Sequence, residues 1–285
     1  MKRTLVLLVV VATATLAWAG GIAAARSTDA PARPTTAFPS PGGRPLIAAS
    51  QPTAGLPTLS ENWSGYAVTD TAKFNYVHSE FVQPAIKCTG APDRYTSNWV
   101  GLDGFTSDTV EQDGTAAWCG GPSNTTPFYK AWYEMYPANS YNVFSVQPGD
   151  LIDTSVDYAG GKYTLTVSDL SSHKSYSDVG TCSSCLRSSA EWIIERPAGC
   201  NRSETSCFLF ALANFTSSIM SEDVAGTSGG AVQGIGSYAS SYPLYMIQPL
   251  KKGFITLDTV GPVDETTQSF TATFDRSGQV TPITL

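Results

Sequence analysis

Residues 151–169, LIDTSVDYAGGKYTLTVSD, decide the fold class. Two runs, 151–158 and 162–169, are rich in Val, Ile, Thr and Tyr, and they flank Ala159-Gly160-Gly161. Branched and aromatic side chains favour a pleated, half-buried strand, and paired glycines accept the backbone angles of a tight turn. This stretch therefore predicts a β-hairpin.

The same pattern recurs on both sides of the hairpin. From Trp63 onward, short β-type runs are broken by Gly, Pro, Asn, Asp and Ser, and we expect strands at 74–83, 95–102, 128–136, 189–196, 207–215, 254–260 and 268–275. No long window keeps the period of an amphipathic helix. Many strands without intervening helices predict an all-β sandwich or barrel.

The first 57 residues differ in composition from the rest. Lys2 and Arg3 precede an apolar run at 4–16, and small residues offer a cut after Ala19 or Ala25, so residues 1–25 are predicted to be a signal peptide. Residues 26–57 are rich in Pro, Ala, Ser and Thr, which predicts a propeptide or linker. Residues 58–285 are then expected to be one secreted, extracellular domain.

The charge of that domain argues against two classes of partner. The first 57 residues hold five of the 17 basic residues and one of the 24 acidic ones, which leaves 12 basic against 23 acidic, or −11. This is the wrong sign for nucleic acid or for an anionic membrane. A high carboxylate content suits a protein that works in acid, although it also simply aids solubility.

Six cysteines all lie within residues 58–285, and an even number in an exported chain favours disulfides. Cys200 and Cys207 would clip one loop, and Cys182 and Cys185 would close a tight ring, although the sequence permits other pairings. A zinc site built from these four cysteines is the alternative. The remaining two are Cys88 and Cys119.

Three predicted strands carry a carboxylate on a face suited to an extended polymer. Side chains alternate between the faces of a strand, so Glu191 shares its face with Ile193 and Glu195. Carboxylates beside aromatic residues suit a groove for a peptide or a sugar chain. The two other faces are those of Trp132, Glu134 and Tyr136, and of Trp99, Gly101 and Asp103.

Glu191 and Gln112 are the residues that could carry out chemistry together. Glu191 lies between aromatic and aliphatic neighbours, and burial there would raise its pKa. Such a carboxyl can exchange a proton with water. Gln112 offers an amide N–H that can stabilise an oxyanion. One carboxyl and one amide suffice for the attack of water on a peptide bond.

Five ordered motifs resemble the glutamic peptidases, the eqolisin family of secreted acid proteases. They are 62–66 (NWSGY), 99–104 (WVGLDG), 112–114 (QDG), 131–137 (AWYEMYP) and 190–195 (AEWIIE). The resemblance runs from about Asn62 to Val260 and implies a concanavalin-like β-sandwich of two antiparallel sheets.

The resemblance also implies the roles of individual residues. Gln112 and Glu191 would form the catalytic dyad, in which Glu191 activates water and Gln112 stabilises the oxyanion. Position 116 is an alanine where the best-known fungal members carry an aspartate, so the support of Gln112 should differ. The same resemblance makes 26–57 a weakly basic pro-segment. Cleft-lining or supporting roles fall to Trp63, Trp99, Asp103, Trp132, Glu134 and Tyr136.

Three other functions use the same sequence features. A sandwich glycosidase would pair Glu191 with Glu195, but four residues of strand separate them by ~13 Å, more than either glycosidase geometry allows. A serine protease would use Ser228 in 226–230 (GTSGG) and would need a histidine base. The two histidines, His78 and His173, both lie outside the Ala-His-Cys sequence typical of chymotrypsin-like enzymes. A non-catalytic module could bind peptide or glycan in the aromatic groove.

The favoured function is a secreted, acid-acting endopeptidase of the glutamic type, with protein or peptide substrates. No phosphate loop, haem motif or metal cluster stands out, so we expect no cofactor and no metal. We also expect a monomer that binds neither nucleic acid nor, after signal removal, a membrane.

Overall fold

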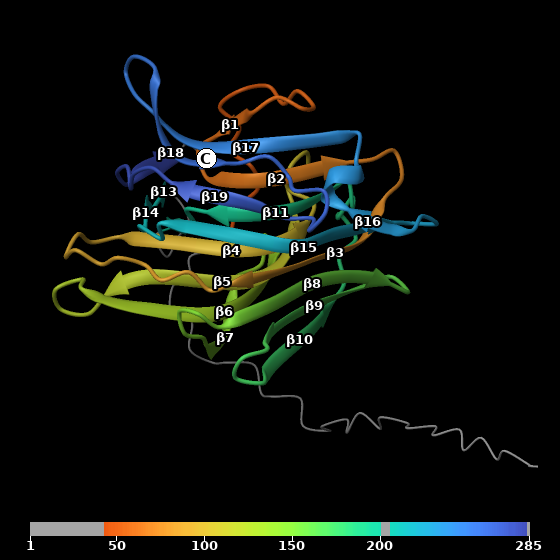
Figure 1. Cartoon of the computed structure of the whole chain (residues 1–285), viewed down its shortest axis with the longest axis horizontal. Helices are drawn as coiled ribbons and strands as arrows, with labels where there is room; N and C mark the ends of the chain where they lie inside the picture. The colour runs from red at the N-terminus through yellow and green to blue at the C-terminus, as the bar shows by residue number, and fades with distance from the viewer. Residues whose placement is uncertain (1–42, 201–205, 284–285) are drawn as a thin grey trace, which may run out of the picture. The chain divides into compact units, whose positions relative to one another are not determined.

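Two stacked β-sheets form the body of the protein, as seen in a computed structural model that describes residues 43–200 and 206–283 (Figure 1). The predicted signal peptide and the first part of the predicted pro-segment lie outside these residues. Strands follow one another without intervening α-helices in the described chain, and η1 (Ile235–Ser237) is a single 3₁₀ turn. Nowhere in 43–200 or 206–283 is a helix long and apolar enough to cross a bilayer. The all-β sandwich prediction is confirmed.

The first sheet follows the order β17, β2, β11, β4, β5, β6 and β7, which is also their order down Figure 1. All of these neighbours are antiparallel. The bounds are β17 (Ser240–Pro249), β2 (Trp63–Thr69), β11 (Ser189–Glu195), β4 (Arg94–Leu102), β5 (Val110–Gly120), β6 (Thr126–Tyr136) and β7 (Tyr141–Ser145).

The second sheet follows the order β18, β19, β15, β3, β8, β9 and β10, also antiparallel throughout. β17 pairs with both β2 and β18, so hydrogen bonding passes from one sheet to the other. The bounds are β18 (Phe254–Val260), β19 (Phe270–Phe274), β15 (Ser217–Thr227), β3 (Phe74–Val82), β8 (Leu151–Ala159), β9 (Lys162–Asp169) and β10 (Lys174–Gly180).

Short strands complete the fold at the edges. β1 (Thr58–Ser60) and β14 (Ala211–Leu212) pair in parallel with β17 and β4, and β16 (Val232–Gly234) pairs with β15. A separate small sheet contains β12 (Ala198–Cys200), β13 (Cys207–Leu209) and β20 (Thr281–Ile283). The single strand expected at 207–215 is wrong: β13 pairs with β12 and β20, while β14 turns away to pair with β4.

The predicted hairpin is confirmed as β8 and β9, and it turns through Gly160 and Gly161 at φ of 58° and 83°. Three disulfides are present, Cys88–Cys119, Cys182–Cys185 and Cys200–Cys207. The four cysteines of the zinc alternative are therefore paired with each other and offer no thiolates, so that alternative is wrong.

The first sheet is buried on both of its faces. One face joins the second sheet in the main core, where Val68, Val100 and Trp192 are fully buried. The other face carries a second cluster, which we call the tryptophan cluster. Because all seven residues of β11 are buried, its polar residues on the second face lie within an apolar surround. The tryptophan cluster contains Trp63, Ala67, Trp99, Phe105, Val110, Ala116, Trp132, Ile193 and Leu244.

Candidate active site

Strand register brings three polar residues into one row on the tryptophan-cluster face. Glu191 of β11 pairs with Gly101 of β4, Gly101 pairs with Gln112 of β5, and Gln112 pairs with Glu134 of β6. Residues paired across neighbouring strands point to the same face. Two strand spacings of about 4.8 Å set the backbones of Gln112 and Glu191 roughly 10 Å apart. Long side chains can therefore meet over Gly101.

Gly101 keeps the space between the two side chains open. A Cβ atom there would lie 2.9 Å from the Trp99 ring and 3.3 Å from the Gln112 Cβ. The lower of these separations is closer than non-bonded carbons approach without a shift of the neighbour. Glycine therefore permits the close packing of Gln112 and the Trp99 ring at this position.

Glu134 fixes the amide of Gln112. The Gln112 Nε2 donates a hydrogen bond of 2.7 Å to Glu134 Oε2, and both side chains are buried. Burial raises the pKa of Glu134 well above its ordinary value, and the charge of Glu195 raises it further. Gln112 Oε1 has no hydrogen-bond partner among the described residues. Within the described residues, the second N–H and the oxygen of the amide have no hydrogen-bond partner, although the Gly43 backbone lies directly against the amide.

Glu191 is buried and lacks a full hydrogen bond. Its exposure is 0%, and neither carboxylate oxygen has a hydrogen bond of full geometry within 43–200 and 206–283, although the Ser189 side chain and the Phe105 backbone N–H lie close enough to favour its charged form. Burial raises the pKa of Glu191 well above its ordinary value, and the charges of Asp103 and Glu111 raise it further. Buried polar atoms in native proteins are nearly always paired. Unpaired ones in a row with Gln112 mark a place where water or a ligand is expected.

The three tryptophans predicted to line the cleft lie beside this row. Trp99 and Trp132 occupy the next row along β4 and β6, together with Ile193. Trp63 packs edge-on against Trp99, with ring centroids 5.0 Å apart. Tyr136 is partly buried at the border of the tryptophan cluster. These rings form the apolar wall around the polar row.

Asp103 lies apart from the row and holds the segment that leads into β11. Its carboxylate accepts hydrogen bonds from the backbone N–H groups of Leu186, Arg187 and Ser188 at 2.6–2.8 Å. It also accepts one from the Ser188 hydroxyl at 2.9 Å. Asp103 therefore positions the strand that carries Glu191.

Two glutamates were not predicted as members of the site. Glu195, four residues after Glu191 on the same face, accepts a 2.9 Å hydrogen bond from Trp99 Nε1, and burial raises its pKa to about 8. Glu111, next to Gln112 but on the opposite face, has its pKa raised to about 9 by burial and by Asp103. Strand alternation located Glu195 on the correct face, but only the register shows that it meets Trp99.

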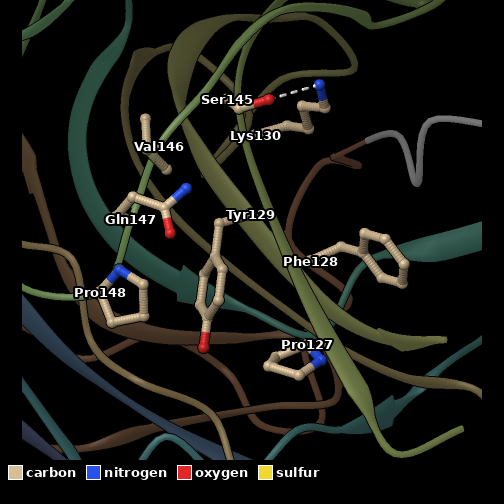
Figure 2. Close-up of a pocket in the computed structure, with 8 residues that line it drawn as sticks. All are labelled: Pro127, Phe128, Tyr129, Lys130, Ser145, Val146, Gln147 and Pro148. Carbon is tan, nitrogen blue, oxygen red and sulfur yellow. Dashed lines mark hydrogen bonds between the residues drawn. The ribbon is translucent and has the colours of Figure 1, made fainter.

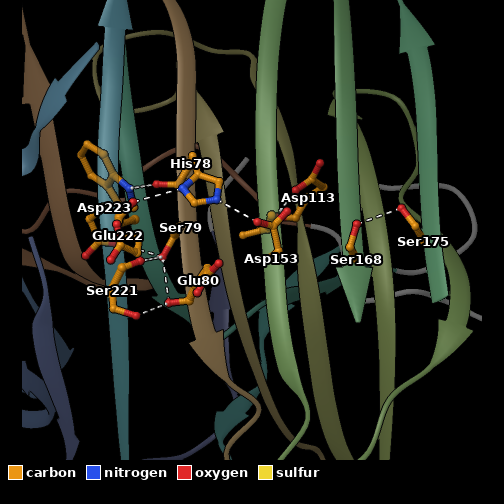
Figure 3. A network of polar contacts seen from close by, with 12 residues as sticks. His78, Ser79, Glu80, Asp113, Asp153, Ser168, Ser175, Ser221, Glu222 and Asp223 are labelled. Atoms are coloured by element: carbon orange, nitrogen blue, oxygen red, sulfur yellow. Dashed lines mark hydrogen bonds and ion pairs between the residues drawn. The ribbon is translucent and has the colours of Figure 1, made fainter. Parts of the chain in front are cut away.

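Other groups that could hold a ligand lie away from the row. His78, Glu80 and Asp153 could surround a cation on the other sheet, where Figure 3 shows His78 directed at Asp153. Glu111 lies near Cys182 and Cys185, but the sulfurs of these cysteines are joined in a disulfide. Neither group contains a residue of the row.

A hollow of about 420 Å³ lies beside β6, and Figure 2 shows the eight residues that line it. Its only charged side chain, Lys130, donates a 2.8 Å hydrogen bond to Ser145 Oγ. The lining contains none of the row residues. The hollow is therefore separate from the candidate active site.

Comparisons with known proteins identify the family of the chain. Residues 61–260 match the Peptidase A4 family. Scytalidopepsin B of Scytalidium lignicola is 30% identical over 183 residues, which cover 61% of this chain and 66% of that protein. The alignment thus spans slightly less than two thirds of the curated relative.

Two solved structures share the architecture. A scytalido-glutamic peptidase structure matches with a TM-score of 0.62 and 22% identity, over 75% of this chain and 98% of that one. The aspergilloglutamic peptidase of Aspergillus niger matches with a TM-score of 0.50 and 25% identity, over 64% and 99%. The chain therefore belongs to the Peptidase A4 family, the glutamic-type endopeptidases that its ordered motifs resemble.

Proposed function

We propose that the protein is a secreted, acid-acting endopeptidase in which Gln112 and Glu191 are the catalytic dyad. The observation that carries this proposal is the register row, which sets unpaired, buried polar atoms of both residues on either side of Gly101. Family membership supports the reaction class, and a scytalido-glutamic peptidase of the same fold has been solved with a peptide-based transition-state analogue. Residues 58–285 would be the catalytic domain.

In the reaction, the ionised form of Glu191 takes a proton from water as the water oxygen bonds to the carbonyl carbon. Burial raises the pKa of this carboxyl in the closed site, so water that enters with the substrate must first solvate it and lower its pKa. The carbonyl electrons move to its oxygen, and the free N–H of Gln112 stabilises the resulting oxyanion. The C–N bond then breaks, and Glu191 returns the proton to the leaving nitrogen. Glu134 keeps the Gln112 amide oriented through its 2.7 Å hydrogen bond.

Acid conditions suit this chemistry because carboxyl groups other than Glu191 lie near the oxyanion, and acid keeps them neutral. Burial raises the pKa of Glu134 and brings that of Glu195 to about 8, so both are neutral in acid. As the pH rises through these values, negative charge near the oxyanion opposes its formation. We therefore expect activity on the acid side and its loss toward alkaline pH.

The proposal is tested by cleavage of a denatured protein across pH 2–8. The full chain would be assayed intact and after proteolytic cutting of the exposed stretch 51–57. Gln112→Ala and Glu191→Ala should each lose at least about 100-fold in rate, while Ser228→Ala should match the parent. Activity that survives Glu191→Ala would contradict the dyad. No cleavage by the cut or uncut parent would favour the peptide-binding alternative.

Secretion follows from the predicted signal peptide at 1–25 and agrees with three disulfides in the described chain. We propose that residues 26–57 are removed to give the mature enzyme. Sequencing the N-terminus of the secreted protein checks this: a start near Thr58 agrees with it, and a start at residue 26 contradicts it.

A further inference from the structure

Three aromatic side chains form a second row on the face of the first sheet that carries Gln112. Tyr95 of β4 pairs with Trp118 of β5, and Trp118 pairs with Phe128 of β6. Trp118 follows Gln112 by six residues, and the register of β5 with both neighbouring strands is unbroken between them. Side chains an even number of residues apart on one strand point to the same face. We call Tyr95, Trp118 and Phe128 the aromatic ladder.

The rings of the aromatic ladder are nearly parallel. The ring centroids of Tyr95 and Trp118 are 6.2 Å apart with 11° between their planes, and those of Trp118 and Phe128 are 5.6 Å apart with 18°. A Cβ atom on Gly120 would lie 3.0 Å from the Phe128 ring, so the glycine lets this ring rest on the backbone. Phe210 supports the other end, with its centroid 4.0 Å from that of Tyr95. The ladder is therefore held in place before any ligand binds.

The aromatic ladder is open to solvent, unlike the tryptophan cluster on the same face. Phe128 is 40% exposed, and Tyr95 and Trp118 are partly exposed, whereas the tryptophans of the cluster are 0–1% exposed. Single apolar residues scattered over a surface are ordinary, but a contiguous exposed group marks a binding surface. Three adjacent rings on three adjacent strands form such a group.

The aromatic ladder lies in line with the candidate active site along the strands. Six residues at about 3.4 Å each set the backbone of Trp118 roughly 20 Å from that of Gln112. Six residues of an extended peptide span about the same length. One polypeptide can therefore contact the dyad and the ladder together, with about six residues between the two points.

Lys130 borders the ladder, two residues after Phe128 on the same strand and face. An ammonium group has three N–H donors, and one of them bonds to Ser145 Oγ at 2.8 Å. Phe128 and Lys130 also line the hollow of about 420 Å³ beside β6 (Figure 2). At Phe128 the ladder thus continues into a recess that has room for a large side chain and a donor for a peptide carbonyl group.

We propose that the aromatic ladder is a distal binding site for the polypeptide substrate, and that it takes an aromatic or large apolar residue about six positions from the bond that is cut. This proposal rests on the proposed peptidase function, because continuity with the dyad is what identifies a polypeptide as the occupant. Such a site favours long, unfolded chains over short peptides. It contributes equally to the bound substrate and the transition state, so it lowers KM and leaves kcat unchanged.

The first test compares KM values after the full chain is cut within 51–57. A short quenched peptide is extended by about eight residues at one end or the other, with either phenylalanines or serines in the extension. For at least one end, the phenylalanine extension should lower KM about threefold to tenfold relative to the serine extension, and Phe128→Ala should remove this difference. Ile219→Ala is the matched control, since Ile219 is 56% exposed on the second sheet, and it should keep the difference. Equal KM values for both extensions at both ends would overturn the proposal.

The second test measures binding without hydrolysis. Trp118 is the one tryptophan within 43–200 and 206–283 that is partly exposed, since the other four are 0–1% exposed, so quenching of fluorescence by acrylamide reports on the ladder. In the cut chain with Glu191→Gln, the phenylalanine-extended peptide should protect the fluorescence from acrylamide and the serine-extended peptide should not. Trp118→Phe should abolish this protection.

The two tests separate failure of the ladder from failure of the peptidase function. Protection by the phenylalanine-extended peptide without hydrolysis by the cut parent would support the ladder and contradict the peptidase function. Hydrolysis without protection would overturn the ladder alone. Protection by an oligosaccharide but by neither peptide would also overturn it and assign the rings to a glycan instead.

Discussion

The row on the first sheet and the polar surface of the second sheet contain similar side chains, but these side chains differ in burial and in hydrogen bonding. On the second sheet, His78 Nε2 meets Asp153 Oδ2 at 2.9 Å, Nδ1 meets the Glu222 carbonyl at 3.1 Å, and the two side chains are 17% and 29% exposed (Figure 3). On the first sheet, Glu191 and Gln112 are fully buried, and Glu191 is the one buried carboxylate of the described chain in which both oxygens lack a full hydrogen bond. Other buried carboxylates, such as Asp223 of the second sheet, have one unpaired oxygen.

This difference separates a structural arrangement from a functional one. Leaving a buried polar atom unpaired costs roughly 1–3 kcal/mol, so a fold selected only for stability would pair it or remove it. The His78–Asp153 pair satisfies both partners near water and has a small net effect. The unpaired atoms of the row are retained at a cost, as expected where a substrate supplies the missing partners.

The largest effect should follow from closing the gap in the row. Gly101→Val places a side chain between Glu191 and Gln112 and against the Trp99 ring. We expect activity to fall at least about 100-fold, similar to the loss of one oxyanion donor. Gly261→Ala is the matched control, since a Cβ there meets only a carbonyl oxygen at 3.8 Å. Peptide hydrolysis within threefold of the parent for Gly101→Val would show that the gap is not the reaction site.

A smaller effect should follow from freeing the Gln112 amide. Glu134→Ala removes the acceptor of the 2.7 Å hydrogen bond, and we expect kcat to fall about tenfold with little change in KM. Glu134→Gln keeps an acceptor oxygen and should retain more activity in acid, with a weaker loss at higher pH. Equal kcat values for the two variants would contradict the positioning role of Glu134, because only Gln keeps an acceptor for the Gln112 amide.

Buried carboxyls should make the fold more stable in acid than at neutral pH. Burial raises the pKa of Glu111 to about 9 and that of Asp113, Asp223 and Asp258 well above their ordinary values. In the unfolded chain these groups ionise near pH 4, so above that pH the folded state binds more protons, and stability falls as the pH rises toward their folded pKa values.

Urea unfolding from pH 3 to pH 9 measures this trend. Each such carboxyl lowers the free energy of unfolding by up to about 1.4 kcal/mol per pH unit between its two pKa values. With Glu111→Gln, the free energy of unfolding should fall less steeply above pH 5. A urea midpoint that rises steadily from pH 4 to pH 8 would contradict the expected loss of stability with rising pH.

The smallest effect should follow from breaking the His78–Asp153 pair on the second sheet. Burial alone would lower the pKa of His78, but its hydrogen bonds to Asp153 and Glu222 outweigh this and raise it. The pair therefore stabilises the fold below about pH 6.5 and loses its effect as the pH rises through the folded pKa. Asp153→Asn should cost about 0–1 kcal/mol at pH 5 and leave peptide hydrolysis unchanged; a large loss of hydrolysis would mean that the two sheets are coupled.

Local pattern was enough to predict the sandwich and the dyad candidates, but not their surroundings. The β8–β9 hairpin follows from propensity and turn chemistry, and the faces of Glu191, Glu134 and Trp99 follow from alternation. β5 was not predicted as a strand because VEQDGTAAWCG contains Gly, Asp and Ala, residues that rarely favour strands. Its burial between β4 and β6 overrides that preference.

Long-range register explains most of what the sequence could not predict. Nothing near Gly101 in the sequence indicates that it pairs with both Gln112 and Glu191. The contact between Gly43 and Gln112 joins residues 69 positions apart, in a segment whose composition predicts only a linker or propeptide. Such contacts depend on the assembled sheet, so only the three-dimensional structure reveals them.

The central claim is that Gln112 and Glu191 act as one unit across Gly101, and a double-mutant cycle tests it most directly. Peptide hydrolysis at acid pH would be measured for the parent, Gln112→Ala, Glu191→Gln and the double variant, each cut within 51–57, with thermal unfolding as a check on folding. Because residues that act together show non-additive losses, the double variant should be about as slow as the slower single variant. Losses that multiply would show that the two residues act independently and would contradict the claim.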